Sequence, residues 1–241
     1  MRSSRSIALI LATLCALSAR SALCDGTPSG SEVNRLASLE ESESDFAVAL
    51  AAHRRGDFDI AVLAYQQAIE KDPGFVEAHV NLARALSDQG LQTEAEGQLD
   101  RAMRTHRDQS GIHKVRGLVA LRRGEPALAV ESLTRARELR PEDPEILTNL
   151  GAALIAQQRT TAAIGVLERS LDLEPSNPST ALNLGLAHDL ASDAGRAAYH
   201  YHHFLDLSQR DDPLREDVQH RLDLLLGSVP NAVSAAPKGA R

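Results

Sequence analysis

Three asparagines that recur in the same local context carry the most informative chemistry in the sequence. Asn81, Asn149 and Asn183 each precede a leucine, within NLA, NLG and NLG. The second and third lie 34 residues apart, and the first precedes the second by twice that distance. An asparagine amide both donates and accepts hydrogen bonds, so a row of them can bind the backbone of an extended peptide whatever its side chains. Alternatively, each amide bonds only neighbouring backbone, as many side chains do.

Histidine and cysteine offer weaker signals. His200 and His203 share a helix face next to His202, which would suit a metal ion or a pH-sensitive contact. A zinc site needs three or four convergent ligands, however, and these histidines are expected on a solvated outer face. The chain contains no GxSxG, HExxH, CxxC, P-loop or GxGxxG motif. We therefore expect no catalytic residues, no metal site and no cofactor.

The composition is acidic and aliphatic. The 241 residues include 33 Asp and Glu against 26 Lys and Arg, with 3% aromatic residues and no tryptophan. Nucleic-acid binding requires clustered basic residues, often with aromatic side chains on which bases stack. The composition therefore argues against a nucleic-acid partner and leaves a protein partner open.

The first 24 residues have the layout of a secretory signal peptide. Arg2 and Arg5 precede an apolar run over residues 7–17, and small residues follow. The run is too short to cross a bilayer, so we expect export to the periplasm or secretion without a permanent anchor. Cys24 could be lipidated and attach the chain to a membrane, but the residue before it is leucine rather than a small one. Both cysteines lie within residues 1–24, so no disulfide is expected in the mature chain.

A 34-residue period organises the middle of the chain. In this frame position 20 is always alanine, position 8 is Ala or Gly, and position 24 is Tyr or Leu. Small residues at two columns allow antiparallel helices to approach closely, and the large column fills the space beside them. Position 15 carries Gly56, Gly90 and Gly124, where a helix end favours a positive φ, whereas Gln158 and Ser192 replace glycine in the last two units. The five units span residues 42–75, 76–109, 110–143, 144–177 and 178–211.

These columns, together with proline at position 32, resemble the tetratricopeptide repeat. The resemblance implies an all-α, right-handed superhelical solenoid of five helix pairs, in which the first helix of each pair lines a concave groove. Residues 212–226 have an apolar stripe that fits a C-terminal capping helix. We expect residues 25–41 to be a flexible linker and residues 227–241 a disordered tail, because both are rich in small and polar residues.

The resemblance also implies which columns face the groove. The three asparagines occupy position 6, where Ala47 and Val115 interrupt the row. The neighbouring groove columns are largely apolar, although some of their residues could instead pack between helices. The candidate peptide-binding residues are Asn81, Asn149, Asn183, Val80, Leu118, Leu121, Ile155, Leu182 and Leu186. The carboxylate clamp of chaperone-binding members is not matched, because Lys114 is followed by Leu118 where the clamp has asparagine.

The sequence therefore predicts an exported, non-enzymatic adaptor. Its groove would bind an extended, partly apolar peptide segment of a protein partner, without a cofactor and without nucleic acid. The alternative is a structural scaffold that self-associates through its end repeats or its convex face. The sequence does not indicate the oligomeric state of the protein.

Overall fold

The computed structural model describes residues 30–228, so the predicted signal peptide and nearly all of the predicted tail lie outside the described residues. Within that range every regular element is a helix and none is a strand. The helices are α2 (Gly30–Arg55), α3 (Phe58–Lys71), α4 (Val76–Asp88), α5 (Gln92–Thr105), α6 (Ser110–Arg122), α7 (Pro126–Leu139), α8 (Pro144–Ala156), α9 (Thr160–Leu173), α10 (Pro178–Leu190), α11 (Ala194–Leu207) and α12 (Arg215–Ser228). No helix of residues 30–228 is long and apolar enough to span a bilayer.

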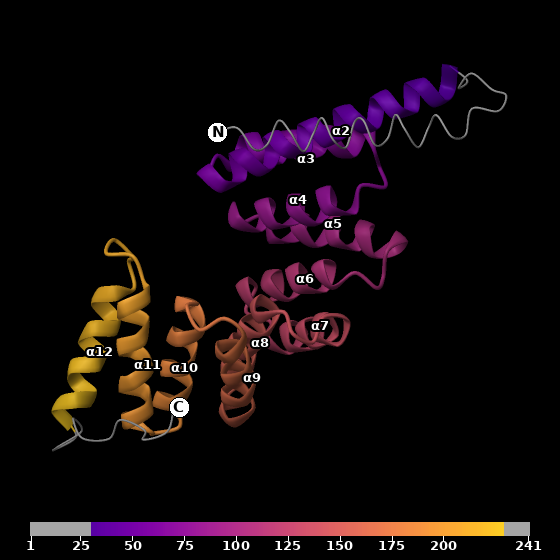
Figure 1. Cartoon of the computed structure of the whole chain (residues 1–241). Helices are drawn as coiled ribbons and strands as arrows, with labels where there is room; N and C mark the ends of the chain where they lie inside the picture. The colour runs from indigo at the N-terminus through magenta and orange to yellow at the C-terminus, as the bar shows by residue number, and fades with distance from the viewer. Residues whose placement is uncertain (1–29, 229–241) are drawn as a thin grey trace, which may run out of the picture.

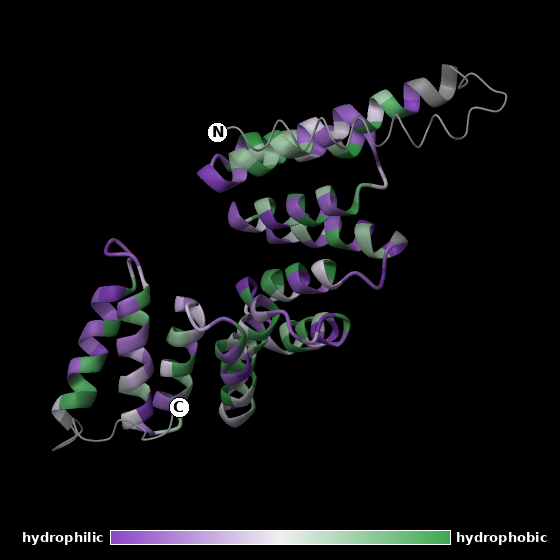
Figure 2. Ribbon diagram, in the orientation of Figure 1, coloured by the Kyte–Doolittle hydropathy of each residue, from purple (hydrophilic) through white to green (hydrophobic). Residues whose placement is uncertain are grey.

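The helices form five stacked pairs followed by the single helix α12, which confirms the predicted solenoid (Figure 1). Each helix packs against its neighbours along the chain, and the first helices of successive pairs also touch: α4 contacts α6, α6 contacts α8, and α8 contacts α10. The first helices therefore make the inner row of the solenoid. Hydrophobic faces turn towards neighbouring helices and hydrophilic faces outwards (Figure 2).

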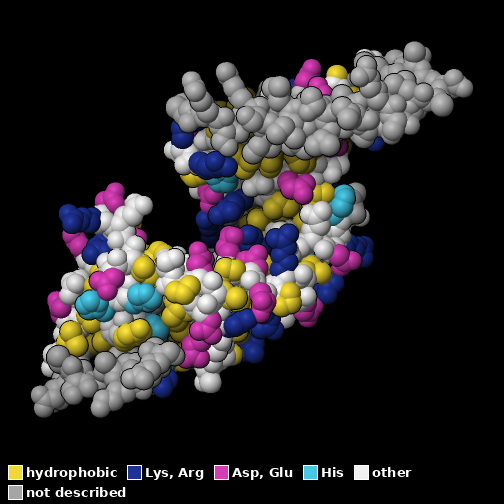
Figure 3. All heavy atoms as spheres, viewed as in Figure 1, with side chains coloured by type: hydrophobic (Ala, Val, Ile, Leu, Met, Phe, Trp, Pro, Cys, Tyr) yellow, Lys and Arg dark blue, Asp and Glu magenta, His cyan; other side chains and the backbone are white. Residues whose placement is uncertain are grey.

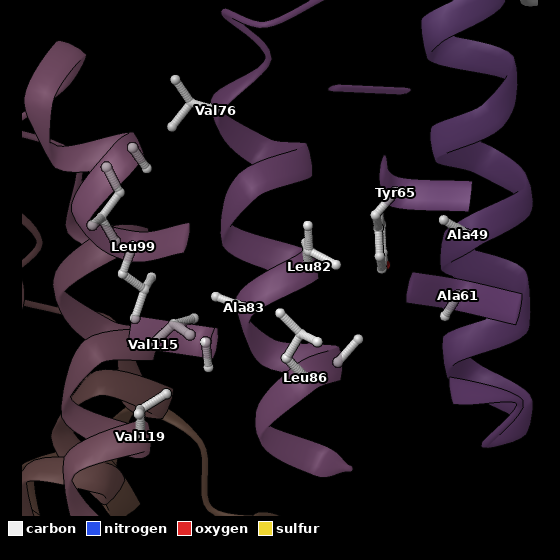
Figure 4. Packing of buried hydrophobic residues seen from close by; sticks show 14 of the residues in the cluster. Ala49, Ala61, Tyr65, Val76, Leu82, Ala83, Leu86, Leu99, Val115 and Val119 are labelled. Atoms are coloured by element: carbon white, nitrogen blue, oxygen red, sulfur yellow. The ribbon is translucent and has the colours of Figure 1, made fainter. Parts of the chain in front are cut away.

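Close packing within each pair depends on the small residue at position 8 and the large residue at position 24. A Cβ atom added to Gly151 would lie 2.4 Å from Cδ2 of Leu167, and one added to Gly185 would lie 2.5 Å from Cδ1 of Tyr201. The Leu167 side chain is completely buried. In the first pair, Tyr65 occupies the equivalent place and packs in the same cluster as Ala49 (Figure 4). The columns predicted from the sequence thus set the distance between the helices.

The turn within each pair requires a left-handed residue. Gly56, Gly90 and Gly124 have φ values of 80°, 83° and 74°, as predicted. Gln158 and Ser192 occupy the same turns with φ of 60°, although neither is glycine. The left-handed region costs a residue with a side chain roughly 1–2 kcal/mol, so these two turns retain the geometry at a cost in stability.

We therefore expect Gln158→Gly to raise the free energy of unfolding by about 0.5–1 kcal/mol, because glycine adopts this conformation without a steric penalty. Urea denaturation measures the change. The control is Gln157→Gly: Gln157 has φ of −83° and gains nothing from glycine, so this variant should lose stability. A loss with Gln158→Gly would contradict the argument.

Three hydroxyl groups form a buried cluster between α8, α9 and α10. Thr148 Oγ1 lies 2.8 Å from Ser170 Oγ and 2.6 Å from Thr180 Oγ1. Ser170 Oγ donates to the carbonyl oxygen of Pro144 at 2.9 Å. Each of these buried polar groups thus has a hydrogen-bond partner, which is the condition for placing it in a core.

At the N-terminal end the structure differs from the predicted linker. Residues 30–41 belong to α2, whose continuation packs along α3. Ser38 and Ser42 donate hydrogen bonds of 2.9 Å to the carbonyl oxygens of Lys71 and Ala68, which lie in the last turn of α3. The Ala68 carbonyl also accepts a backbone hydrogen bond from Asp72 N, whereas Lys71 is the last residue of α3, where a carbonyl has no partner within its own helix. The two serine hydroxyls therefore bond the C-terminal end of α3 to α2. Residues 30–41 therefore form a helix, although their composition indicates flexibility.

The last pair ends against α12, which begins at Arg215 and extends to Ser228 rather than over residues 212–226. Val218, Leu222 and Leu225 are buried against Phe204 of α11. Phe204 stands at position 27 of its unit, where the first three units have Ala68, Ala102 and Ala136. Leu214, which belonged to the predicted apolar stripe, precedes the helix and is 45% exposed. The helix covers the end of the core as a cap does.

Candidate functional site: the concave groove

The inner row of first helices borders a hollow between the part of the molecule that holds α2–α5 and the part that holds α10–α12. The space-filling view shows this hollow, with basic and acidic side chains on its wall (Figure 3). All nine residues predicted to bind a peptide lie on α4, α6, α8 and α10. None of the nine is fully buried, and Leu186 is 39% exposed. Val80, Leu121, Ile155 and Leu182 also pack against the core clusters, so each has one side in the core.

The three asparagines are not equivalent. Asn81 Nδ2 donates to the carbonyl oxygen of Glu77, one turn earlier in α4, at 2.7 Å. This bond agrees with the alternative interpretation, in which each asparagine amide bonds only neighbouring backbone. Asn149 and Asn183 form no side-chain hydrogen bond with any residue between 30 and 228, and both are partly exposed. Their amides are therefore available for a ligand.

Asn81 borders two hollows along α4. One, of about 480 Å³, lies between α2 and α4, and Leu50, Phe58 and Arg84 line it together with Asn81. The other, of about 420 Å³, lies between α4 and α6, and its walls include Val80. Both hollows are wide enough for side chains of a bound segment and are open to solvent.

A chain of charged groups links three successive first helices beside the first hollow. Asp88 of α4 accepts a hydrogen bond from His53 Nε2 of α2 at 2.9 Å and pairs with Arg122 Nη2 of α6 at 2.5 Å. Burial alone would raise the pKa of Asp88, but the hydrogen bonds from His53 and Arg122 outweigh it and hold the pKa below its usual value. The carboxylate is therefore ionised, and hydrogen bonds from both partners hold it. We did not expect these bonds between helices from the sequence. His53 stands at position 12 of the first unit, and Asp88 and Arg122 stand at position 13 of the second and third units.

Two arginines of the same hollow lack such partners. Arg54 and Arg84 line the α2–α4 hollow and are exposed. Burial raises the pKa of Tyr65 to about 12, while the positive charges of Arg84 and Arg54 act in the opposite direction. The Tyr65 hydroxyl is itself buried without a hydrogen-bond partner among the described residues.

Further ion pairs link α6 with α8 and α10 with α12. Lys114 of α6 pairs with Glu145 of α8 at 2.6 Å. The lysine that matches one position of the carboxylate clamp is therefore already paired with a carboxylate of the same protein. Asp189 of α10 accepts two hydrogen bonds of 2.6 Å from Arg221 of α12. These bonds lower the pKa of Asp189 and tie the cap to the rim of the groove.

The histidines are placed differently from the expectation of a solvated face. The ring of His200 stacks on that of His188 of α10, with centroids 5.4 Å apart, and His188 is only 2% exposed. His203 is partly buried as well, and only His202 of the group is exposed. The sequence did not predict this, because neither histidine belongs to the repeated columns that place residues between the helices of a pair. Residues 30–228 contain no group of three ligands that could hold a metal ion.

Comparisons with known proteins agree with this geometry. Two family models described as tetratricopeptide repeat match residues 52–118 and 115–178, which together exceed half of the chain. The chain therefore belongs to the tetratricopeptide repeat proteins, a family that generally mediates protein–protein interactions. No curated protein matches the chain.

Among solved structures, the chain is similar to PilF of Pseudomonas aeruginosa, with a TM-score of 0.67 and 20% identity over 78% of this chain and 85% of PilF. It is also similar to PilW, described as a widely conserved type IV pilus biogenesis factor, with a TM-score of 0.68 and 22% identity over 77% and 86% of the two chains. YrrB, described as having an unusual peptide-binding site, matches with a TM-score of 0.55 and 19% identity over 73% and 90%. At these identities the likeness shows the fold.

Proposed function

We propose that the protein is an exported, non-enzymatic adaptor whose concave groove binds an extended, partly apolar peptide segment of a protein partner. The observation that carries the proposal is the accessible row of Asn149 and Asn183, with Asn81 further along, beside partly exposed leucines on the inner helices. Amide groups suit a peptide backbone, and the apolar residues suit alternate side chains. The peptide-binding site described for YrrB supports the same use of this fold.

The test replaces Asn81, Asn149 and Asn183 by alanine together. Partners are first captured by crosslinking to the purified mature chain, and the affinity of the partner segment is then measured. The two available amides, Asn149 and Asn183, contribute roughly 0.5–1.5 kcal/mol for each hydrogen bond, so the triple variant should bind about 5- to 150-fold more weakly. A matched control replaces Gln66 and Gln67, exposed amides of α3, and should bind normally. Unchanged affinity of a folded triple variant for the partner segment would contradict the proposal.

A scaffold that self-associates is the second candidate, and one observation favours it. Val48, Ile60 and Leu63 of the first pair are 54%, 53% and 57% exposed, at an end where no earlier repeat covers α2 within the described residues. Light scattering across the micromolar range distinguishes the two. A strict monomer favours the adaptor, whereas a mass that rises with concentration and falls back in a Leu63→Glu variant favours the scaffold.

A further inference from the structure

The hollow between α2 and α4 carries positive charge that the described residues do not compensate. Arg54 and Arg84 both line it, and neither pairs with a carboxylate of residues 30–228. The carboxylate in the same wall, Asp88, is already bonded to His53 and Arg122. Two guanidinium groups therefore face this hollow without a counter-charge.

The charge balance of this hollow differs from that of the hollow beside α5, where Asp100 and Asp108 accompany Arg104 and Arg107, which form no ion pair within residues 30–228. The protein has more acidic than basic residues, and several other arginines have carboxylate partners, including Arg135 with Asp108 and Arg169 with Glu142. A pair of arginines kept free in a recess is a site for an anion from outside the chain. Guanidinium groups bind carboxylates with geometric specificity because their donors match both oxygens.

The remaining walls narrow the class of ligand. Leu50 and Phe58 form an apolar side of the hollow, and Asn81 adds an amide. A free inorganic anion would leave the apolar side unused. A carboxylate on a chain that also carries an apolar side chain would use both.

We propose that this arginine pocket, formed by Arg54 and Arg84 with Leu50, Phe58 and Asn81, binds an Asp or Glu side chain within the partner segment. The inference rests on the proposed function, because it names the chemistry of a segment that lies in the same groove. The carboxylate belongs to the interior of the segment rather than to its end. The groove continues past Asn81 into the hollow between α4 and α6, so the bound chain can extend from the pocket along the inner helices.

Three labelled peptides test the pocket by fluorescence anisotropy with the mature protein. The first alternates leucine and glutamate, the second alternates leucine and glutamine, and both are acetylated and amidated. The third is the glutamine peptide with a free C-terminal carboxylate. We expect the glutamate peptide to bind about tenfold more tightly than either of the others, and the difference to shrink as salt is added.

The double variant Arg54→Gln and Arg84→Gln should abolish the preference for glutamate. Its matched control, Arg104→Gln with Arg107→Gln, removes the same charge outside the groove, beside α5, and should keep the preference. Three results would overturn the proposed carboxylate pocket. They are equal binding of the two capped peptides, a preference for glutamate that survives in the double variant, and tightest binding of the peptide with a free C-terminal carboxylate. Absence of binding by all three would overturn it as well. None of these results decides the asparagine test, so the two proposals fail separately.

Discussion

Replacing Leu167 by alanine will lower the free energy of unfolding by about 3–4 kcal/mol, the largest loss that we expect from a single substitution. The side chain is completely buried, and its Cγ and Cδ2 atoms would both lie 2.4 Å from a Cβ atom added to Gly151. Because glycine has no side chain that can move into the space, the cavity left by alanine would persist. Urea denaturation followed by circular dichroism measures the loss.

A matched control and a rescue make this prediction specific. Leu186→Ala removes the same atoms from a groove leucine that is 39% exposed, and should cost about 1 kcal/mol or less. Adding Gly151→Ala to the Leu167→Ala variant refills part of the cavity and should restore part of the stability. Equal losses at Leu167 and Leu186 would contradict the packing that we describe for positions 8 and 24.

Acidification should destabilise the C-terminal pair through His200. Burial lowers the pKa of His200 to about 4, with further contributions from the charges of His188, His203 and Arg196. Burial also lowers the pKa of His188, on which it stacks, against the opposing charges of Asp193 and Glu168. The unfolded chain thus binds protons that the folded chain does not, between pH 6.5 and about pH 4. The stabilising effect of neutral His200 is complete above pH 6.5 and is lost as the pH falls through this window.

From these values we expect His200 to account for about 2 kcal/mol of the stability lost between pH 7 and pH 5. To separate His200 from all other groups, the measured quantity is the difference between the wild-type protein and His200→Gln, from urea denaturation at both pH values. The control is His202→Gln, an exposed histidine of the same helix, which should retain the wild-type dependence on pH. If His200→Gln loses as much stability on acidification as the wild-type protein, the buried histidine pair has no such role.

The sequence predicts the fold well because the determinants are local and repeated. The small residue of position 8 and the large residue of position 24 belong to the same unit, so one frame places every pair. The turn geometry holds even where glycine is absent, because the backbone bonds that close the turn remain. Gln158 N donates to Ile155 O at 2.8 Å, as Gly124 N donates to Leu121 O at 3.0 Å.

The parts that the sequence did not predict depend on contacts between elements. The helix over residues 30–41 is stabilised by Ser38 and Ser42, whose hydroxyls reach carbonyls of α3. The bonds of Asp88 join three units, and no column of a single unit indicates them. The groove residues were placed correctly on the inner helices, but which of them bind a partner stays a prediction.

The nearest-neighbour character of this solenoid also bears on how the chain folds. Each pair contacts only the pairs beside it, and no contact joins the first units to the last among the helices that pack together. Contacts between residues close in sequence form quickly, since little loop entropy opposes them. A chain that leaves the ribosome with its N-terminus first can therefore complete each helix pair before the next one is synthesised, and its exposed edge at any moment is a single helix pair wide.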